Sequence, residues 1–298
     1  MGHEHHHHDY SRAFGIGITL NAAFVCAELF FGFTSHSLAL IADAGHNFSD
    51  VLALAAAWGA AILSRKIPSA RFTYGLRSSS ILAGLFNAVL LLVVTGGITW
   101  EALTRLAHPE QVAGKTVVMV ALLGFLINLF TAMLLRPGNR EDLNIRAAFL
   151  HMATDAAMSL GVALSGAIVL YSGFTLLDPL VSLAISGAII YGTRDLLKDS
   201  MGLALHAVPE GIDPQAVRDY LAALPGVDEV HDLHIWGMST TECALTVHLV
   251  MPNGYPGDAF MAGISRKLDD LFHIGHATMQ VETGDPDHPC SLAPEHLV

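Results

Sequence analysis

The sequence predicts an all-α bundle of six transmembrane helices followed by a small α+β domain. Three observations carry this prediction. The 298-residue chain is 52% hydrophobic but only 14% charged, against roughly 25% in an ordinary soluble protein. Six apolar stretches, each close to the length that crosses a bilayer, follow one another in the first two thirds of the chain. Short segments punctuated by prolines come after them. A plain soluble enzyme is therefore excluded.

The six apolar stretches are expected to cross the membrane in turn, joined by short loops. The third and fourth are the clearest, because Ser78–Trp100 and Thr116–Leu135 hold no charged residue; buried helices of a large soluble core are the alternative for them. The first stretch is no signal peptide, since it lacks a small-residue cleavage site and another span follows it almost at once. The predicted spans are Ser11–Phe33, Leu38–Leu63, Ser78–Glu101, Thr116–Leu135, Ala147–Tyr171 and Leu176–Thr193.

The distribution of basic residues predicts the orientation, because lysine and arginine are retained on the cytoplasmic side. The amino terminus, the loops after spans two and four, and the end of span six hold ten of them, whereas the other three loops hold only Arg105 and Lys115. Both termini are therefore expected in the cytoplasm. Short loops and the lack of a targeting extension favour a bacterial inner membrane.

The formal charge of −12 comes entirely from the last hundred residues, which carry 15 acidic and 3 basic side chains. An acidic domain repels nucleic acid phosphates and attracts cations, so DNA and RNA are not expected as partners. The three cysteines form no CxxC pair, so they indicate neither a disulfide framework nor a zinc finger.

The segment after span six is predicted to fold as a small α+β domain. Asp213 fits an N-cap position and Pro214 the first helical position. The order helix, strand, strand, helix, strand indicates a ferredoxin-like plan. The expected elements are a helix from Pro214 to Leu224, strands over Val227–Trp236 and Ala244–Met251, a helix over Gly257–Phe272 and a strand over Ala277–Thr283.

Two of the predicted spans carry the pattern HxxxD: His46 with Asp50 in span two, and His151 with Asp155 in span five. Ionisable residues at membrane depth are expensive and mark functional pathways. A separation of four places both side chains of a pair on one helix face. Two such faces that meet offer two imidazoles and two carboxylates, a set suited to tetrahedral zinc. The sequence therefore predicts an intramembrane metal site.

The alternative for these pairs is interhelical hydrogen bonding between histidine and aspartate. Asp43 shares a face with the first pair and is a candidate ligand partner or proton acceptor. Glu28, Asn21 and Asn128 are also polar at membrane depth. Bundle packing explains these three at least as well as a direct functional role.

The motifs together carry a family resemblance. They are Ser37–Leu40 leading into Asp43, His46 and Asp50; His151 and Asp155; Leu177–Pro179; and, in the soluble part, His231–Trp236 and Thr278–Glu282. Over nearly its whole length the chain resembles the cation diffusion facilitator family. Members of that family are metal-exporting homodimers with six transmembrane helices and a C-terminal cytoplasmic metallochaperone-like domain.

The resemblance implies efflux of Zn²⁺, and of Cd²⁺, in exchange for protons. In the family, paired HxxxD motifs are associated with zinc and cadmium selectivity, and aspartate at the first histidine with broader metal choice. Proton exchange is physically sensible, because zinc binding needs neutral imidazoles and ionised carboxylates. Alternating access would then tilt the helix pair that carries the four ligands against the rest. The resemblance also implies a homodimer in contact with membrane lipid.

In the soluble domain the resemblance implies a structural metal ion, Zn²⁺, near the dimer interface. Its ligands would be His231, His248 and Glu282, one from each predicted strand. On pattern alone each could be an ordinary strand residue. His234 and His276 are weaker candidates, and Gln280 stands where some relatives have a histidine. A cation there would relieve repulsion between two acidic domains.

The expected division of the chain is a histidine-rich cytoplasmic tail (1–10), a transmembrane domain (11–200), the cytoplasmic α+β domain (207–285) and a C-terminal tail (286–298). In the last segment His288 and Cys290 could add soft ligands, although a disordered tail is the expectation. The histidines of the first segment could collect metal or be partly an added tag. The loop 64–75 has neither histidine nor acid, which predicts no metal site and basic contacts to anionic lipid.

Two other classes of protein could also carry histidines and acids in membrane helices. An intramembrane metalloprotease is not expected, because HExxH is absent and no glutamate adjoins either paired histidine; the chain is thus not expected to be an enzyme. A membrane-anchored metal sensor would use the acidic domain as detector, but it gives no reason for four ligands inside the membrane. Within the transporter class, Co, Ni, Fe and Mn remain alternatives, since affinity order alone does not decide selectivity.

Overall fold

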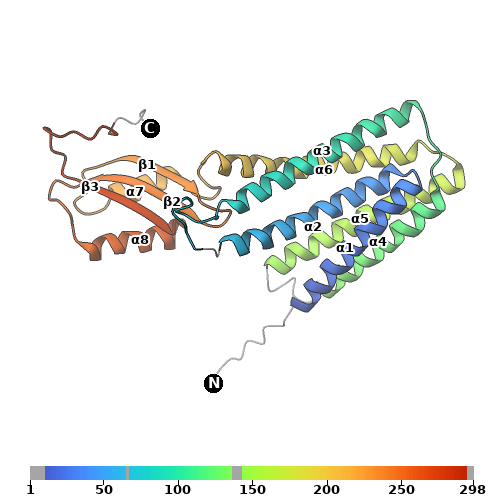
Figure 1. Ribbon diagram of the computed structural model, residues 1–298, viewed down its shortest axis with the longest axis horizontal. Coiled ribbons are helices and arrows are strands. Elements are labelled where there is room, and N and C mark those ends of the chain that lie inside the picture. Colours follow the sequence, from blue (N-terminus) through green and yellow to red (C-terminus); the bar gives the residue numbers. More distant parts are fainter. Residues whose placement is uncertain (1–10, 65–66, 136–142, 294–298) are drawn as a thin grey trace, which may run out of the picture. The chain divides into compact units, whose positions relative to one another are not determined.

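The computed structural model describes residues 11–64, 67–135 and 143–293. Within these ranges six long helices are followed by two short helices and three strands (Figure 1). The long helices are α1 (Ser11–Thr34), α2 (Leu38–Ser64), α3 (Ser79–Ala107), α4 (Gly114–Leu135), α5 (Leu143–Ser172) and α6 (Leu177–Ala204). The later elements are α7 (Pro214–Ala222), β1 (Glu229–Gly237), β2 (Cys243–Val250), α8 (Asp258–Phe272) and β3 (His276–Glu282).

The chain divides into two compact units, which are described separately. The first holds Met1–Ala55 and Asn87–Arg194, and the second holds Ala56–Phe86 and Asp195–Val298. The long helices lie where the apolar stretches predicted them. The largest differences are the ends of α3 and α6, at Ala107 instead of Glu101 and at Ala204 instead of Thr193, and the start of α5, at Leu143 instead of Ala147. Hydropathy marks only the part of a helix suited to hydrocarbon, whereas charged residues such as Arg and Glu continue a helix well.

Four helices among the described residues are long and apolar enough to cross a membrane by length and composition. They are Ser79–Ala107, Gly114–Leu134, Phe149–Ser172 and Leu177–Ala204. Large apolar side chains on these helices face outward: Val93, Trp100, Leu126 and Leu164 are all more than half exposed. Such a surface is a liability in water and is stable against lipid chains.

The interior of the first unit is packed with small and branched side chains, among them Ala39, Ala121, Val162 and Ile185. Helices α4 and α5 come close to each other at Gly114 and Gly166. A Cβ atom added to Gly114 would lie 2.8 Å from the carbonyl oxygen of Gly166. Small residues allow such close backbone approach, and packing of this kind holds helices together in a membrane.

The start of α2 is held by polar contacts to α6. The Ser37 hydroxyl accepts a hydrogen bond from the Leu40 amide at 3.2 Å, as an N-cap residue does. The Asp178 carboxylate, in the first turn of α6, accepts from the Leu38 amide at 2.8 Å and from the Ser37 hydroxyl. Asp178 is only 1% exposed. Its negative charge also suits the positive end of the helix dipole.

Asp178→Ala is expected to destabilise the protein by about 2 kcal/mol, because it leaves a buried amide and a buried hydroxyl without their acceptor. Thermal unfolding of the purified protein in detergent measures this as a lower melting temperature. Asp270→Ala, an exposed acid on α8, is the matched control and should stay within about 0.5 kcal/mol of wild type. Equal melting temperatures for Asp178→Ala and wild type would contradict the role of this cap.

The second unit contains a three-stranded sheet in the order β1-β2-β3. Strands β1 and β2 are antiparallel, and β2 and β3 are parallel. Helices α7 and α8 pack on one face through Val217, Leu221, Ile264 and Leu268 (Figure 1). The element order is the predicted one, and the Asp213 side chain caps α7 by accepting from the Gln215 amide.

The sheet gathers histidines on the face away from these helices. His231 pairs directly with His248 across β1 and β2, and His248 pairs with Gln280 of β3. The register of β1 shifts between His231 and His234, where Asp232 adopts a left-handed backbone with φ of 50°. This bulge redirects the side chains that follow it.

The residues just before α3 and in its first turn contact the turn between β1 and β2. Arg77 forms an ion pair with Glu242 at 2.7 Å. The Ser78 hydroxyl donates to the Met238 carbonyl oxygen, and the Ser80 hydroxyl accepts from the Thr240 amide, both at 3.1 Å. These contacts attach the start of α3 to the sheet domain within the second unit.

Candidate metal centres

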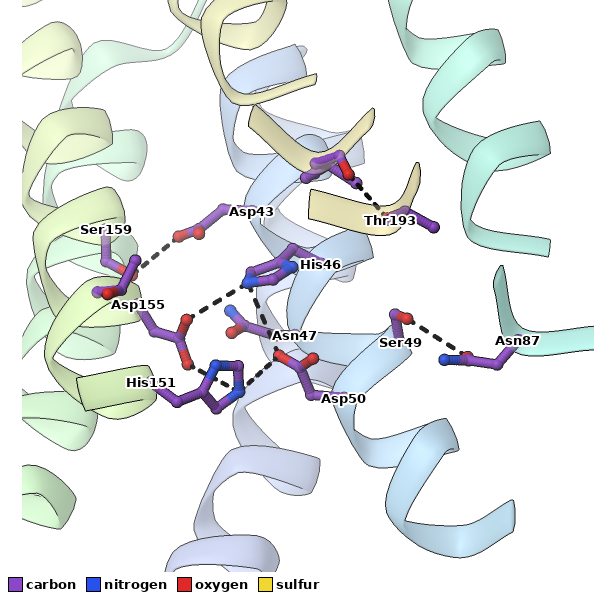
Figure 2. A network of polar contacts seen from close by, with 12 residues as sticks. Asp43, His46, Asn47, Ser49, Asp50, Asn87, His151, Asp155, Ser159 and Thr193 are labelled. Carbon is purple, nitrogen blue, oxygen red and sulfur yellow. Dashed lines mark hydrogen bonds and ion pairs between the residues drawn. The ribbon is translucent and has the colours of Figure 1, made fainter. Parts of the chain in front are cut away.

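The two HxxxD motifs meet between α2 and α5, as Figure 2 shows. His46 Nε2 lies 3.3 Å from Asp155 Oδ1 and 3.8 Å from Asp50 Oδ2. His151 Nε2 lies 3.3 Å from Asp50 Oδ2 and 3.7 Å from Asp155 Oδ2. Imidazole and carboxylate groups therefore alternate around a ring, and each helix contributes one of each.

These separations suit a tetrahedral ion. Ligand atoms about 2.0–2.1 Å from zinc lie about 3.3–3.4 Å from one another at tetrahedral angles. Ligand atoms of His46, Asp50 and Asp155 all lie within 4.8 Å of one another. His151 is the outermost member, because its side chain is 44% exposed, whereas that of Asp155 is 2% exposed. Small shifts of the outer imidazole would complete the shell.

The carboxylates of this ring are short of hydrogen-bond donors. Asp50 Oδ2 and Asp155 Oδ2 are buried and accept no hydrogen bond. Buried polar atoms are normally satisfied, so each such atom calls for an explanation. A bound cation supplies one, since both oxygens border the ring. The residues present thus fit a divalent ion by donor type, spacing and unmet bonding capacity.

Further polar side chains are buried in the same unit. Asp43 accepts a hydrogen bond from the Ser159 hydroxyl at 2.9 Å, and Glu28 accepts from the Asn47 amide at 3.2 Å. Glu28 and Asn128 are fully buried. Asp43 thus bonds to α5 next to the ring rather than to an imidazole nitrogen (Figure 2). Asn21 lies outside the residues whose side chains the structure describes.

The second cluster lies on the open face of the sheet. His248 Nδ1 is 2.9 Å from Glu282 Oε1, and His231 Nε2 is 3.4 Å from Glu282 Oε2. The two imidazole rings are 5.2 Å apart between centroids. His231 is 3% exposed, and neither of its ring nitrogens has a hydrogen bond. The structure therefore brings the three predicted residues together.

Two residues outside the predicted set shape this cluster. Asp232 Oδ2 lies 3.4 Å from His248 Nε2, so the ring nitrogen that faces away from the cluster has a carboxylate partner. Such a partner commonly orients a metal-binding histidine. Cys290 Sγ lies 3.5 Å from His248 Nδ1. His231, His248, Glu282 and Cys290 each offer a ligand atom within 4.8 Å of the others.

In this cluster the pKa of the Glu282 carboxyl is lowered, whereas the pKa of the Cys290 thiol is raised. Burial favours a raised pKa for Glu282, but hydrogen bonds from Cys290 and Gln280 and the two histidines outweigh burial, so the pKa lies below its usual value. For Cys290, a backbone hydrogen bond at Leu292 lowers the pKa. Burial and the nearby carboxylates outweigh that bond and raise the pKa above its usual value.

The weaker sequence candidates lie outside the cluster. His234 Nε2 is 2.9 Å from Asp232 Oδ1, and the ring of His276 packs against Tyr74. Gln280 donates to Glu282 Oε1 at 2.9 Å and so holds the carboxylate. In the C-terminal segment, which the structure describes as far as Ala293, a turn after β3 returns Cys290 to the sheet.

An apolar helix bundle with histidine and carboxylate ligands between its helices, joined to a small sheet domain, defines an integral membrane protein that handles divalent cations. Comparison with known families agrees. The family described as "Cation efflux transmembrane domain" matches residues 15–203, and that described as "Cation efflux protein, cytoplasmic domain" matches residues 209–284.

Whole-length relatives are similarly informative. The chain is 34% identical to the metal cation efflux system protein CzcD of Cupriavidus metallidurans, over 98% of this chain and 92% of that protein. It is 35% identical to the zinc transporter ZitB of Escherichia coli, over 95% and 89%. It is 30% identical to a cadmium, cobalt and zinc/H⁺-K⁺ antiporter of Bacillus subtilis, over 97% and 94%. The chain belongs to the cation diffusion facilitator family.

Proposed function

We propose that this protein exports Zn²⁺, with Cd²⁺ as a second substrate, across the membrane in exchange for protons. The transport site consists of His46, Asp50, His151 and Asp155. One observation carries the proposal: the four side chains form a ring of alternating imidazole and carboxylate groups with contacts of 3.3–3.8 Å. The names of relatives, which include zinc transporters and a metal/H⁺-K⁺ antiporter, support the substrate and the exchange.

Exchange follows from competition between protons and metal for the same atoms. Neutral imidazoles and ionised carboxylates bind zinc, and protonation of either removes a ligand. Zinc entering from a near-neutral cytoplasm displaces protons, and protons entering from outside release the zinc. Because α2 and α5 together supply all four ligands, a tilt of this helix pair against the rest of the bundle would open the site to the opposite side of the membrane.

The proposal includes a membrane topology, a domain fold and an oligomeric state. Six helices span the membrane over residues 11–200, and residues 207–285 form a cytoplasmic domain of ferredoxin-like plan. Both termini lie in the cytoplasm of a bacterial cell, and the protein works as a homodimer in the lipid of the inner membrane. The order of strands and helices in the sheet domain supports the ferredoxin-like plan. The match to the cytoplasmic domain of cation efflux proteins supports the cytoplasmic assignment.

Sealed proteoliposomes loaded with a pH-sensitive dye test the function. Adding Zn²⁺ or Cd²⁺ to vesicles that contain the protein is expected to move protons, whereas protein-free vesicles should give no signal. A larger signal with Co²⁺ or Mn²⁺ than with Zn²⁺ would replace the proposed substrate. Tight zinc binding in detergent without any proton movement would overturn transport and favour a membrane-anchored sensor.

We further propose that His231, His248 and Glu282 hold a structural zinc ion in the cytoplasmic domain. The residues fit such an ion, because His231 is buried with both ring nitrogens free of hydrogen bonds. The Asp232 carboxylate also orients His248 toward Glu282. A bound ion would join three strands of one sheet and reduce the negative charge that two copies bring together.

His248→Ala is expected to remove the stabilisation that zinc gives to this domain. A ligand at 100 times its dissociation constant stabilises a folded protein by about 2.7 kcal/mol. Thermal unfolding with and without zinc measures the difference, and His276→Ala, outside the cluster, is the matched control. The same zinc-induced shift in His248→Ala and wild type would count against this site.

A further inference from the structure

We propose that Cys290 is the fourth ligand of the cytoplasmic centre, so that a thiophilic divalent ion closes the C-terminal tail over the sheet. This inference deepens the proposed cytoplasmic site and rests on it. The ion would be held by two imidazoles, one carboxylate and one thiolate, from β1, β2, β3 and the segment that follows β3.

The first argument is the position of Cys290 Sγ beside the other ligand atoms. Cys290 Sγ is 3.5 Å from His248 Nδ1, the same nitrogen that lies 2.9 Å from Glu282 Oε1. His231, His248, Glu282 and Cys290 each offer a ligand atom within 4.8 Å of the others. Zinc–sulfur bonds of about 2.3 Å and zinc–nitrogen bonds of about 2.0–2.1 Å place neighbouring ligand atoms about 3.3–3.6 Å apart. The 3.5 Å between Cys290 Sγ and His248 Nδ1 lies in that range.

The second argument is the path of the chain after β3, from Gly284 to Cys290. Gly284 has φ of 71°, a conformation that glycine adopts readily. The Asp285 side chain then accepts from the Asp287 amide at 2.9 Å and contacts His288 Nδ1 at 3.0 Å. These contacts form a turn, and Pro286 within it and Pro289 directly after it stiffen the chain. The turn returns Cys290 to the open face of the sheet, where tail and strands line a pocket of about 710 Å³.

The state of His231 is an independent observation that indicates a ligand. This imidazole is nine-tenths buried or more and borders the cluster, yet neither ring nitrogen takes part in a hydrogen bond. A buried polar group without a hydrogen-bond partner destabilises the folded state. Coordination of His231 Nε2 to an ion shared with Glu282, 3.4 Å away, removes that destabilisation.

Charge and softness determine the class of ion. One carboxylate and one thiolate balance the two positive charges of a divalent ion, so the bound site is neutral. As the metal–sulfur bond forms, the thiol proton leaves to solvent. Thiolate and imidazole favour Zn²⁺ and Cd²⁺, whereas Mg²⁺, Ca²⁺ and Mn²⁺ prefer oxygen ligands. The tail would therefore respond to the metals that the transporter is proposed to move.

Cadmium titration of the full-length protein tests the thiolate directly, because only sulfur ligands give an intense ultraviolet charge-transfer band with Cd²⁺. Wild type is expected to show the band, and Cys290→Ser to lose at least nine-tenths of it. Cys26→Ser and Cys243→Ser are the matched controls and should keep it, since neither cysteine adjoins a metal cluster among the described residues. A band that survives in Cys290→Ser, or that wild type lacks, would overturn the inference.

Protection from alkylation is a second measurement on the same proteins. Zn²⁺ is expected to slow maleimide labelling of Cys290 at least tenfold in wild type, as read by mass spectrometry of the C-terminal peptide. His231→Ala should abolish this protection, because it removes a ligand from the same ion. Equal labelling rates with and without zinc in wild type would contradict the proposal.

The cadmium band tests the role of Cys290 separately from the proposed transport function. A wild-type protein with the cadmium band but no metal-driven proton movement would overturn transport and leave the thiolate ligand in place. A wild-type protein that moves protons but lacks the band would overturn only the role of Cys290.

Discussion

Asp155→Ala is expected to abolish zinc-driven proton movement in proteoliposomes. Asp155 is the most buried member of the α2–α5 ring, and its two oxygens contact the imidazoles of both His46 and His151. Removing a group that only hydrogen-bonds to a metal ligand already lowers metal affinity or activity by about 10–100-fold. Removing a ligand should therefore lower the initial rate by at least about 100-fold.

Two controls make this result specific. Glu101→Gln removes an acid of α3 that pairs with Arg105 outside the ring, and it should transport zinc at a rate close to that of wild type. Asp155→Ala itself should keep the cadmium–thiolate band of the cytoplasmic domain, which shows that the chain is folded. Zinc-driven proton movement at the wild-type rate in Asp155→Ala would remove the ring from the transport mechanism.

His46→Asp is expected to broaden metal choice, with a loss of zinc preference over manganese of at least about tenfold. The change replaces one of two imidazoles by a carboxylate, and an oxygen-rich site suits harder ions such as Mn²⁺. His46 contacts both carboxylates of the ring, so the new side chain would also add negative charge between them. Initial rates with each metal in the proteoliposome assay give the ratio.

The matched control is His108→Asp, which makes the same replacement at an exposed position after the end of α3. It should leave the zinc-to-manganese ratio unchanged. An unaltered ratio in His46→Asp would mean that selectivity resides outside the first imidazole of the ring.

Much of the fold could be predicted because it depends on local pattern. Long uncharged stretches predict helices in lipid, and proline after Asp213 predicts the start of α7. The spacing of four in HxxxD places each pair on one helix face, and few helix faces in a bundle can hold such charge. The meeting of α2 and α5 at these faces was therefore predictable from composition and spacing together.

The rest depends on irregularities that no periodic pattern contains. Strict alternation along β1 places Asp232 and His231 on opposite faces, but the bulge and the left-handed backbone at Asp232 bring it to His248. The approach of Cys290 depends on a turn after β3 in a segment that has no hydrophobic pattern. The cap of α2 by Asp178 joins positions 140 residues apart.

That cap has a mechanical consequence. A helix whose first amide is bound to its neighbour at one end can swing about that end far more easily than it can slide along its axis. His46 lies eight residues beyond Leu38, or about 12 Å along α2. A swing of roughly 10° about the capped end then displaces the imidazole by about 2 Å, the length of one metal–ligand bond. Ser37 and Asp178 would thus form a pivot for α2, and a small rotation about this pivot would move the metal-binding imidazole by the length of one metal–ligand bond.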